Sequence, residues 1–552
     1  MRQLSGHCAM RRKILCGLSF FLLSVGLCAC GGQTEESSAP QTIQQEESSV
    51  SQPESTDALS DAEEESVDWT AYFQKMSKVK SFKGLEDTNP IMTQRFGADP
   101  YAMVYGDRVY FYMTADAFEY DAANNIKENS YGQIRSLNVV STDDMVNFTD
   151  HGSIQVAGKG GAAKWAGNSW APAAAWKEID GKPKFFLYFA NSGGGIGVLT
   201  ADSPTGPFTD PIGHELVSRN TPNCADVLWL FDPAVLVDDD GNGYLYFGGG
   251  VPQGKVSAPG TGRCVALGDD MISLKGDPIA IDIPYLFEDS GIHKAGNKYY
   301  YTYCTNWQVD AEGTKKYGFT NAEIACLESD SPLGPFTYKE TILENPGKLC
   351  GLYGNNHHCV FRFRDRWYIT YHSRMLEKAM GIEKGYRATC IDEFTMGEDG
   401  TIGKIRQSYA GREQLKYVDP YQENSAVNAA LLAGMTTASI AEDRPNEMVL
   451  SEITDGTYLK VTGVDFGTQG PANFSVKFRL TADSTRPAAI QIRVDNLFKD
   501  VLGYLPLEIS SQADADGFYT ASAALDRSTT GIHDLFLVFA GENLEVKSWQ
   551  FQ

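Results

Sequence analysis

The feature that most constrains the fold is an internal repeat between residues 85 and 415. Five segments share one plan, in which a polar residue leads a short apolar run, a tight turn and an aromatic-rich strand. They start near residues 98, 169, 231, 287 and 355, so they recur at roughly 55–75 residues, the size of one blade of a β-propeller. Hairpin-bearing units of this size predict a five-bladed β-propeller over residues 85–415.

A shorter repeat supports this interpretation. The hexapeptide Ser-Pro-Thr-Gly-Pro-Phe at residues 203–208 returns as Ser-Pro-Leu-Gly-Pro-Phe at residues 331–336. In a propeller the innermost strand of every blade faces the central axis, so the leading residues of the segments should converge at one mouth. These leading residues include three carboxylates and one imidazole: Asp99, Asp232, Glu288 and His357. The repeat therefore predicts a polar site assembled from distant parts of the chain.

Residues 420–552 have a different texture. Short strands with alternating apolar and polar residues stand at 458–461, 474–478, 489–494 and 534–539, and turn residues separate them. This alternation predicts a β-sandwich of the jelly-roll type. The whole chain is thus expected to be all-β, with a propeller followed by a sandwich.

The first 30 residues have the composition of an export signal. A positive stretch at residues 11–13 precedes an apolar stretch over 14–26 that is too short to span a membrane as a helix. The following Leu-Cys-Ala-Cys, which ends at Cys30, resembles a bacterial lipoprotein cleavage site. We therefore expect a lipoprotein signal peptide over 1–30, lipidation of Cys30, and an exported protein anchored to the outer face of the cell membrane. The alternative is an ordinary signal peptide in which Cys30 is incidental.

Residues 31–68 are rich in Ser, Glu, Gln, Thr and Pro and hold almost no aromatic residues. Such a segment cannot bury enough apolar surface to offset the entropy of folding. It is predicted to be a disordered tether between the anchor and the folded domains.

Composition limits the partners and the cysteine chemistry. The net charge of −24 disfavours nucleic acid and anionic lipid headgroups, so attachment to the membrane is expected through the N-terminal lipid only. Neutral sugars are indifferent to this charge. The seven cysteines that follow residue 30 are odd in number and contain no C-x-x-C pair, which argues against a disulfide framework or a zinc site.

Three carboxylates at one mouth suit the hydrolysis of a glycosidic bond. This reaction needs a carboxylic acid that holds its proton beside the leaving oxygen and a second carboxylate across the sugar. Burial or a neighbouring negative charge raises the pKa of the acid and lets it keep the proton near neutral pH. Asp99, Asp232 and Glu288 would supply the two reacting groups and a third that tunes the acid.

The motifs around these carboxylates resemble those of glycoside hydrolase family 43. Ala98-Asp99-Pro100, Phe231-Asp232-Pro233 and Phe287-Glu288-Asp289-Ser290 match the family's motifs in blades one, three and four, in the same order. The resemblance implies that Asp99 is the general base, that Glu288 is the general acid, and that Asp232 raises the pKa of the acid and positions it. It also implies an inverting mechanism, with the two reacting carboxyl groups about 6.5–9.5 Å apart.

Three further motifs extend the resemblance. Trp170-Ala171-Pro172 matches a signature near the sugar pocket, and Gly385-Tyr386-Arg387 matches a strand whose Arg contacts the carboxylates. Asn356-His357 matches an inward His that helps to hold a central calcium ion, largely through waters. The resemblance therefore implies a calcium ion at the propeller centre, no organic cofactor, and sugar contacts from Trp170, Phe231, His357 and Arg387.

The finer resemblance is to the arabinoxylan-debranching members of the family, through residues 287–292, 303–306 and 355–357. It implies an α-L-arabinofuranosidase that removes arabinose from arabinoxylan. A β-xylosidase or an arabinan-active hydrolase of the same family is the alternative, because arabinofuranose and xylose are pentoses with similar hydroxyl placement. A non-catalytic, surface-tethered glycan-binding protein is the alternative from another class, and the complete set of carboxylates argues against it. We expect a monomer.

Residues 420–552 resemble family 6 carbohydrate-binding modules, through residues 456–467, 531–541 and 549–551. Two positions depart from the family pattern. Lys547-Ser548 stands where the family has an Asp that helps to bind a structural calcium ion, and Glu545 stands where it has a sugar-binding Asn. Both departures weaken the expectation of calcium and sugar binding, and bracing of the propeller is the alternative role.

Two glycine-rich motifs are predicted to be turns. Residues 238–243, Asp-Asp-Asp-Gly-Asn-Gly, mimic the start of a helix–loop–helix calcium loop, but aromatic strands flank them and the twelfth position is Gly249 instead of Glu. Residues 193–197, Gly-Gly-Gly-Ile-Gly, lack the following helix that a phosphate-binding loop requires.

Overall fold

The structure is a computed structural model that describes residues 67–482, 486–509 and 512–552. The predicted signal peptide with Cys30, and residues 31–66 of the predicted tether, lie outside these residues. The described part is mostly β-structure, as the sequence predicts, and its helices are short. None of the helices in the described ranges is both long and apolar enough to cross a membrane.

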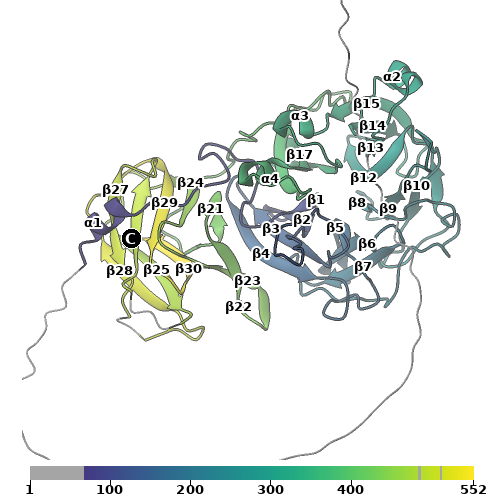
Figure 1. Ribbon diagram of the computed structural model, residues 1–552. Helices are drawn as coiled ribbons and strands as arrows, with labels where there is room; N and C mark the ends of the chain where they lie inside the picture. The colour runs from purple at the N-terminus through teal and green to yellow at the C-terminus, as the bar shows by residue number, and fades with distance from the viewer. Residues whose placement is uncertain (1–66, 483–485, 510–511) are drawn as a thin grey trace, which may run out of the picture. The chain divides into compact units, whose positions relative to one another are not determined.

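Residues 98–394 form antiparallel sheets, each built from consecutive strands (Figure 1). The first sheet contains β1 (Ala98–Tyr105), β2 (Arg108–Thr114), β3 (Ser136–Thr142) and β4 (Phe148–Gln155). The next two contain β5 (Trp170–Ile179), β6 (Lys182–Ala190) and β7 (Ile196–Ala201), then β8 (Ala234–Val237), β9 (Gly243–Gly248), β10 (Gly262–Ala266) and β11 (Ile279–Ile281). The last two contain β12 (Leu286–Ala295), β13 (Lys298–Thr305), β14 (Ile324–Ser329) and β15 (Thr337–Leu343), then β16 (His358–Phe363), β17 (Arg366–Ser373) and β18 (Ala388–Phe394).

The first strands of these sheets contact one another in cyclic order. Strand β1 contacts β5, β5 contacts β8, β8 contacts β12, β12 contacts β16, and β16 contacts β1 again. Figure 1 shows these strands around a common centre, with the later strands of each sheet further out. The leading residues of the sequence repeat therefore come from five separate sheets to one central region.

The two hexapeptide repeats join neighbouring sheets. The hydroxyl of Tyr112 on β2 donates to the carbonyl oxygen of Pro204 at 2.5 Å, and the hydroxyl of Tyr246 on β9 donates to that of Pro332 at 2.6 Å. Both tyrosine rings are fully buried. Each hexapeptide turn thus satisfies the one polar atom of an aromatic side chain that the adjacent sheet buries.

A backbone irregularity recurs at the start of the inner strands. The pairing register shifts between Ala98 and Tyr101, between Trp170 and Ala173, and between Glu288 and Gly291. Asp99 (φ 47°), Ala171 (φ 42°) and Asp289 (φ 70°) lie in these β-bulges and adopt left-handed backbone angles, as does Asp232 (φ 49°), which precedes β8. Such angles are uncommon for residues with a Cβ, and a bulge redirects the side chain that it carries.

The C-terminal part forms two antiparallel sheets that enclose their own core (Figure 1). One contains β22 (Thr436–Ala441), β23 (Arg444–Ser451), β30 (Leu544–Phe551), β25 (Asn473–Leu480) and β28 (Tyr519–Ala524), with β19 (Asn424–Ser425) paired to β30. The other contains β21 (Leu431–Ala433), β24 (Tyr458–Asp465), β29 (Ile532–Ala540), β26 (Ala489–Val494) and β27 (Val501–Pro506). Strand β20 (Asn428–Ala429) instead pairs with β4 and extends the first sheet of the N-terminal part.

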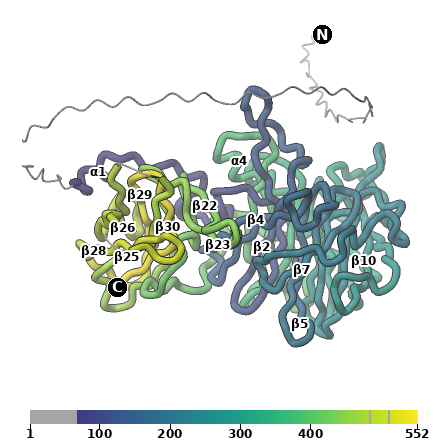
Figure 2. The backbone as a smooth tube through the Cα atoms, turned by 90° about the horizontal axis from the view of Figure 1, so that it is seen from below, coloured from purple at the N-terminus to yellow at the C-terminus, as the bar shows by residue number. Residues whose placement is uncertain are grey.

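Helix α1 (Trp69–Lys75) precedes all strands and packs on the C-terminal sandwich (Figure 2). Asp68 caps it by accepting the backbone N–H of Ala71 at 3.0 Å. Phe73 is 1% exposed and packs among Tyr458 and Phe536 of the sandwich. The sequence predicts no element here, since seven residues are too few to show a helical period. The remaining helices are α2 (Ala311–Tyr317), α3 (Gly347–Cys350) and α4 (Met375–Met380).

The two predicted turns are confirmed. Residues 238–242 connect β8 to β9, where the backbone N–H of Asp238 donates to the carbonyl of Asn242. Residues 192–193 form a turn before β7, closed by the backbone N–H of Gly194, which donates to the carbonyl of Asn191 at 3.2 Å. The seven cysteines of the described part are free and buried.

Candidate active site

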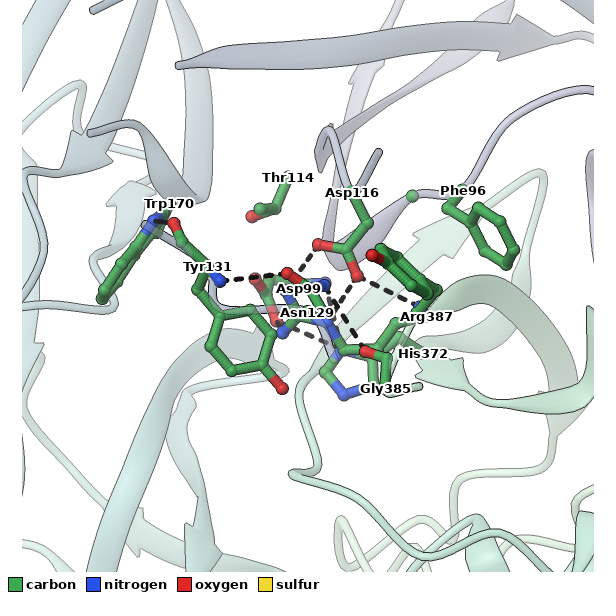
Figure 3. A network of polar contacts seen from close by, with 12 residues as sticks. Phe96, Asp99, Thr114, Asp116, Asn129, Tyr131, Trp170, His372, Gly385 and Arg387 are labelled. Atoms are coloured by element: carbon green, nitrogen blue, oxygen red, sulfur yellow. Dashed lines mark hydrogen bonds and ion pairs between the residues drawn. The ribbon is translucent and has the colours of Figure 1, made fainter. Parts of the chain in front are cut away.

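Asp99 lies at the bulge of β1 and is 5% exposed. Its backbone N–H donates to Nδ1 of His372 at 3.1 Å, and its Oδ1 accepts from Nη1 of Arg387 at 2.9 Å (Figure 3). Burial acts to raise the pKa of Asp99, but the Arg387 guanidinium, together with His372 and His357, outweighs it and holds the pKa well below its usual range. Asp99 is therefore a carboxylate at neutral pH.

Arg387 is itself fixed by Asp116. The guanidinium donates from Nε to Oδ2 at 2.9 Å and from Nη2 to Oδ1 at 2.8 Å, and Oδ2 also accepts the backbone N–H of Arg387 at 3.1 Å (Figure 3). Such two-point pairing is the strongest and most directional contact between Arg and a carboxylate. The ring of Tyr131 lies 4.8 Å from the guanidinium carbon. Asp116 stands in the loop after β2 and belongs to no repeated motif, so its role could not be predicted from the sequence.

Glu288 on β12 has the opposite environment. The side chain is 8% exposed, and Oε1 is buried without a hydrogen-bond partner among the described residues. Burial raises the pKa of Glu288 well above its usual range, and the charges of Asp232, Asp99 and Asp289 raise it further. Glu288 therefore keeps its proton at neutral pH.

Asp232 interacts electrostatically with both Asp99 and Glu288. Its Oδ2 accepts the backbone N–H of Asp289 at 2.9 Å, which ties the residue before β8 to the bulge of β12. Burial and then the charge of Asp99 raise the pKa of Asp232 well above its usual range. Because the charge of Asp232 raises the pKa of Glu288, the pair resists carrying two negative charges at once.

His357 faces three of the carboxylates. Its Nδ1 lies 3.7 Å from Oδ1 of Asp99 and 3.8 Å from Oδ2 of Asp232, and its Nε2 lies 3.2 Å from Oδ1 of Asp289. The neighbouring His358 bonds from Nδ1 to the other oxygen of Asp289, at 2.5 Å. Asp289, to which the sequence analysis gave no role, thus links both imidazoles. It could have been found from its place in the bulge, which matches that of Asp99.

The residues around His357 do not form a direct metal site. The described residues contain no group of three or more His, Cys, Asp or Glu side chains arranged to hold a metal ion. Calcium prefers six to eight oxygen ligands, whereas His357 offers nitrogen. The donor set therefore fits, at most, a hydrated ion that contacts the protein through water.

The two predicted aromatic contacts lie in different surroundings. Trp170 is half-buried, and its Nε1 donates to the carbonyl of Tyr131 at 3.0 Å, which places it beside the Arg387 network (Figure 3). Phe231 is 8% exposed and packs edge-on against Trp229, with ring centroids 5.3 Å apart. Of the predicted residues, His357 and Arg387 both lie close to the carboxylate of Asp99. Phe231 is placed near these groups because it precedes Asp232 in the chain.

A cavity of about 230 Å³ opens beside the cluster. Its lining includes Tyr131, Tyr353, Asn355, His372, Arg374 and Arg387. Polar donors and one exposed aromatic ring, Tyr353, therefore surround a space adjacent to the partners of Asp99. The site thus has a buried carboxylate and a buried carboxylic acid beside a cavity. These groups can act as base and acid in the hydrolysis of a small polar substrate.

The comparisons with known proteins agree with this chemistry. The model of "Glycosyl hydrolases family 43" matches residues 87–402, and that of "Carbohydrate binding module (family 6)" matches residues 425–552. The chain is 43% identical over 482 residues to an arabinoxylan arabinofuranohydrolase of Paenibacillus polymyxa, which covers 84% of this chain and 74% of the relative. It is 44% identical over 491 residues to one of Bacillus subtilis (strain 168), which covers 85% and 93%.

Among solved structures, a family 43 arabinoxylan arabinofuranohydrolase from Bacillus subtilis in complex with cellotetraose superimposes with a TM-score of 0.80. It is 42% identical and covers 86% of this chain and 99% of its own. The match spans both the sheets around the site and the C-terminal sandwich.

Proposed function

Because the chain belongs to family 43 of the glycosyl hydrolases, we propose that it is an inverting α-L-arabinofuranosidase that removes arabinose side units from arabinoxylan. The substrate proposal rests on the two arabinoxylan arabinofuranohydrolases to which the chain is more than 40% identical over most of its length.

In the proposed mechanism, Asp99 removes a proton from a water molecule that attacks the anomeric carbon of the arabinose unit. Glu288 gives its proton to the departing glycosidic oxygen, so one bond forms as the other breaks and the configuration inverts. Asp232 keeps Glu288 protonated by its charge and holds the bulge of β12 through the N–H of Asp289. Arg387 keeps Asp99 ionised, and together with Trp170, Phe231 and His357 it would contact the sugar.

The observation that carries this proposal is the opposite proton affinity of two buried carboxyl groups. Both are less than 10% exposed, yet the pKa of Asp99 is lowered and that of Glu288 is raised. Pairs whose environments push their pKa values apart are typical of an assigned base and acid.

The test is product analysis on arabinoxylan, on an aryl α-L-arabinofuranoside and on an aryl β-D-xyloside, with Glu288→Ala as the control. Release of arabinose that disappears in the control supports the proposal. Release of xylose alone would move the activity to β-xylosidase, and release of neither sugar would leave a glycan-binding protein.

We also propose that the sheets of residues 98–394 are the blades of a five-bladed propeller. The cyclic contacts of β1, β5, β8, β12 and β16 support this count. We propose that the sandwich binds carbohydrate, in line with its family model, and that the protein is a monomer.

For the N-terminus we propose export and anchoring through a lipid on Cys30. Labelling of expressing cells with a radioactive fatty acid tests this, and a Cys30→Ala chain should lose the label. For calcium our proposal is limited to a hydrated ion near His357, and no step of the mechanism depends on it. Loss of activity in a chelator that calcium alone restores would support that ion.

A further inference from the structure

A second cavity, of about 740 Å³, lies away from the active site between the segment that follows α1 and the sandwich. Its volume is in the range of about 300–1,000 Å³ that is typical of small-molecule sites. Four cations line it: Lys78, Lys80 and Lys83 from the segment and Arg493 from β26. No Asp or Glu is among the lining residues, although the protein carries a net charge of −24.

The cations of this cavity lack counter-charges. In the described ranges, none of the four forms an ion pair with a carboxylate. Lys83 and Arg493 are each only 8% exposed, and buried charges are normally paired because desolvation is costly. The carboxylate that raises the pKa of Arg493 is Asp500, which lies outside the lining.

Hydrogen bonds hold these cations in place but leave donors free. Arg493 donates from Nε to Oε1 of Gln491 at 2.7 Å and from Nη1 to the carbonyl of Lys499 at 2.9 Å. Lys78 donates to the carbonyls of Phe73 and Met76 at 3.3 and 3.4 Å. Nη2 of Arg493 has no hydrogen-bond partner among the described residues, so it can bond to a ligand.

The electrostatics of the cavity favour an anionic ligand. Burial lowers the pKa of Lys78, and the charge of Arg493 lowers it further. Burial lowers the pKa of Lys83 to about 7, with Arg412 and Lys460 adding to the effect and Asp87 opposing it. A bound negative group would reverse these shifts.

The rim of the cavity adds an apolar surface. Phe498, in the loop after β26, is 72% exposed, which is unusual for a side chain of this size, and Leu497 lies beside it. A flat exposed ring next to uncompensated cations suits a ligand that has both an apolar face and a negative charge.

We propose that this cavity binds a carboxylate-bearing sugar, such as a uronic acid unit on a hemicellulose chain. Lys78, Lys80 and Arg493 bind the carboxylate, and Phe498 packs against the sugar ring. The choice of a sugar as ligand rests on the proposed function, whereas the anion site rests on the cavity alone. Such a site would hold the enzyme on acidic stretches of its substrate.

The experiment uses the full chain with Glu288→Gln, so that no ligand is consumed. Calorimetry compares a xylo-oligosaccharide that carries one glucuronic acid unit with the same oligosaccharide after reduction of the carboxyl group to an alcohol. We expect the acidic ligand to bind about tenfold more tightly, the effect of one charge-assisted hydrogen bond. Added salt should weaken the acidic ligand only.

Variants locate the binding. Lys78→Gln and Arg493→Gln should each weaken the acidic ligand about tenfold and leave the reduced ligand unchanged. Phe498→Ala should weaken both ligands. Lys477→Gln, which removes a sandwich cation paired with Glu423, is the matched control and should change neither. Arg493 also forms hydrogen bonds within the sandwich, so its substitution can disturb the fold. Lys80→Gln and Phe498→Ala change exposed side chains and therefore test the site without this effect.

Equal affinity for the two ligands, or no effect of the cavity variants, would overturn the proposal. Binding of anionic vesicles without binding of the acidic oligosaccharide would also overturn it and assign the cations to a membrane surface. Arabinose release by the unmodified chain is measured separately, so failure here and failure of the proposed activity are distinguishable.

Discussion

Asp99 and Glu288 are almost equally hidden from solvent, but their neighbours differ. Arg387 and two imidazoles surround Asp99, whereas Glu288 faces Asp232 and has one oxygen without a partner among the described residues. Burial alone would raise both pKa values, so the difference comes from the nearby charges. Proton affinity in this site is therefore set by a few side chains that can be changed one at a time.

The pH dependence of the reaction should follow from these shifts. The active form has Asp99 ionised and Glu288 protonated, so kcat/KM should fall only when the pH rises through the high pKa of Glu288 or drops through the low pKa of Asp99. Asp232→Asn removes a neighbouring negative charge and lowers the pKa of Glu288. The alkaline limb of the profile on an aryl arabinofuranoside should then move to lower pH. An unmoved limb would show that Asp232 does not control the acid.

Asp116→Asn should impair the reaction although Asp116 acts only through Arg387 and Asp99. Asp116 bonds to Arg387 at three points, and Arg387 bonds to Asp99, so its loss should displace the base and lower kcat by about 10²-fold. The loss should persist on aryl substrates with good leaving groups, because these bypass the acid but not the base. It should add little to the effect of Arg387→Ala.

Asp150→Asn is the matched control for that variant, since Asp150 is also a buried carboxylate paired with an arginine, Arg95, but outside the site. It should lower the melting temperature and leave kcat unchanged. If both variants lower the melting temperature and neither lowers kcat, Asp116 has a purely structural role.

At the scale of elements, the inner strands could be predicted because a short motif recurs at the start of β1, β5 and β12 and just before β8. Asp99, Asp232 and Glu288 stand in these motifs, so a catalytic role could be predicted for each of them from the order of the motifs. Asp116 and Tyr131 could not be predicted, because they stand in the long connection between β2 and β3, where no period or motif fixes the backbone. The folding of such a loop depends on contacts with Arg387, which is remote in the chain.

Helix α1 gives a prediction at this scale. Phe73→Ala removes a ring that is 1% exposed between α1 and the sandwich and should lower the free energy of unfolding by about 3 kcal/mol. Chemical denaturation followed by tryptophan fluorescence measures this. Turnover of an aryl arabinofuranoside should not change, and Gln74→Ala, at an exposed position of the same helix, is the control. An equal stability of both variants would mean that α1 is not docked in solution.

At the scale of the molecule, the two folded parts share hydrogen bonds as well as a sheet. Strand β20 extends the sheet of β4, and Asn147 exchanges two hydrogen bonds with the backbone of Thr462, each 2.9 Å long. Lys83 donates to the carbonyls of Pro90 and Ala430, at 3.0 and 2.6 Å. The described residues accordingly belong to one compact unit. The predicted domain boundary near residue 420 marks a change in the strand and turn pattern of the sequence. Both sides of it belong to the same compact unit.

This sharing predicts cooperative unfolding. Calorimetry of the full chain should give one transition, and a chain that ends at residue 419 should melt several degrees lower. The truncation removes the Thr462 N–H that Oδ1 of Asn147 accepts and the strand that pairs with the edge of β4, and each unsatisfied buried polar group costs about 1–3 kcal/mol. Two separate transitions in the full chain would contradict the prediction.

The contact between β1 and β16, which are distant in the sequence, also has a consequence for folding during synthesis. Asp99 is made early and Glu288 much later, while Arg387 is made only as β18 begins. During synthesis from the N-terminal end, Asp99 is therefore exposed to solvent long before the Arg387 guanidinium that lowers its pKa has been made. Hydrolysis by a nascent chain is expected only after Arg387 and β18 have been synthesised and have folded against β1.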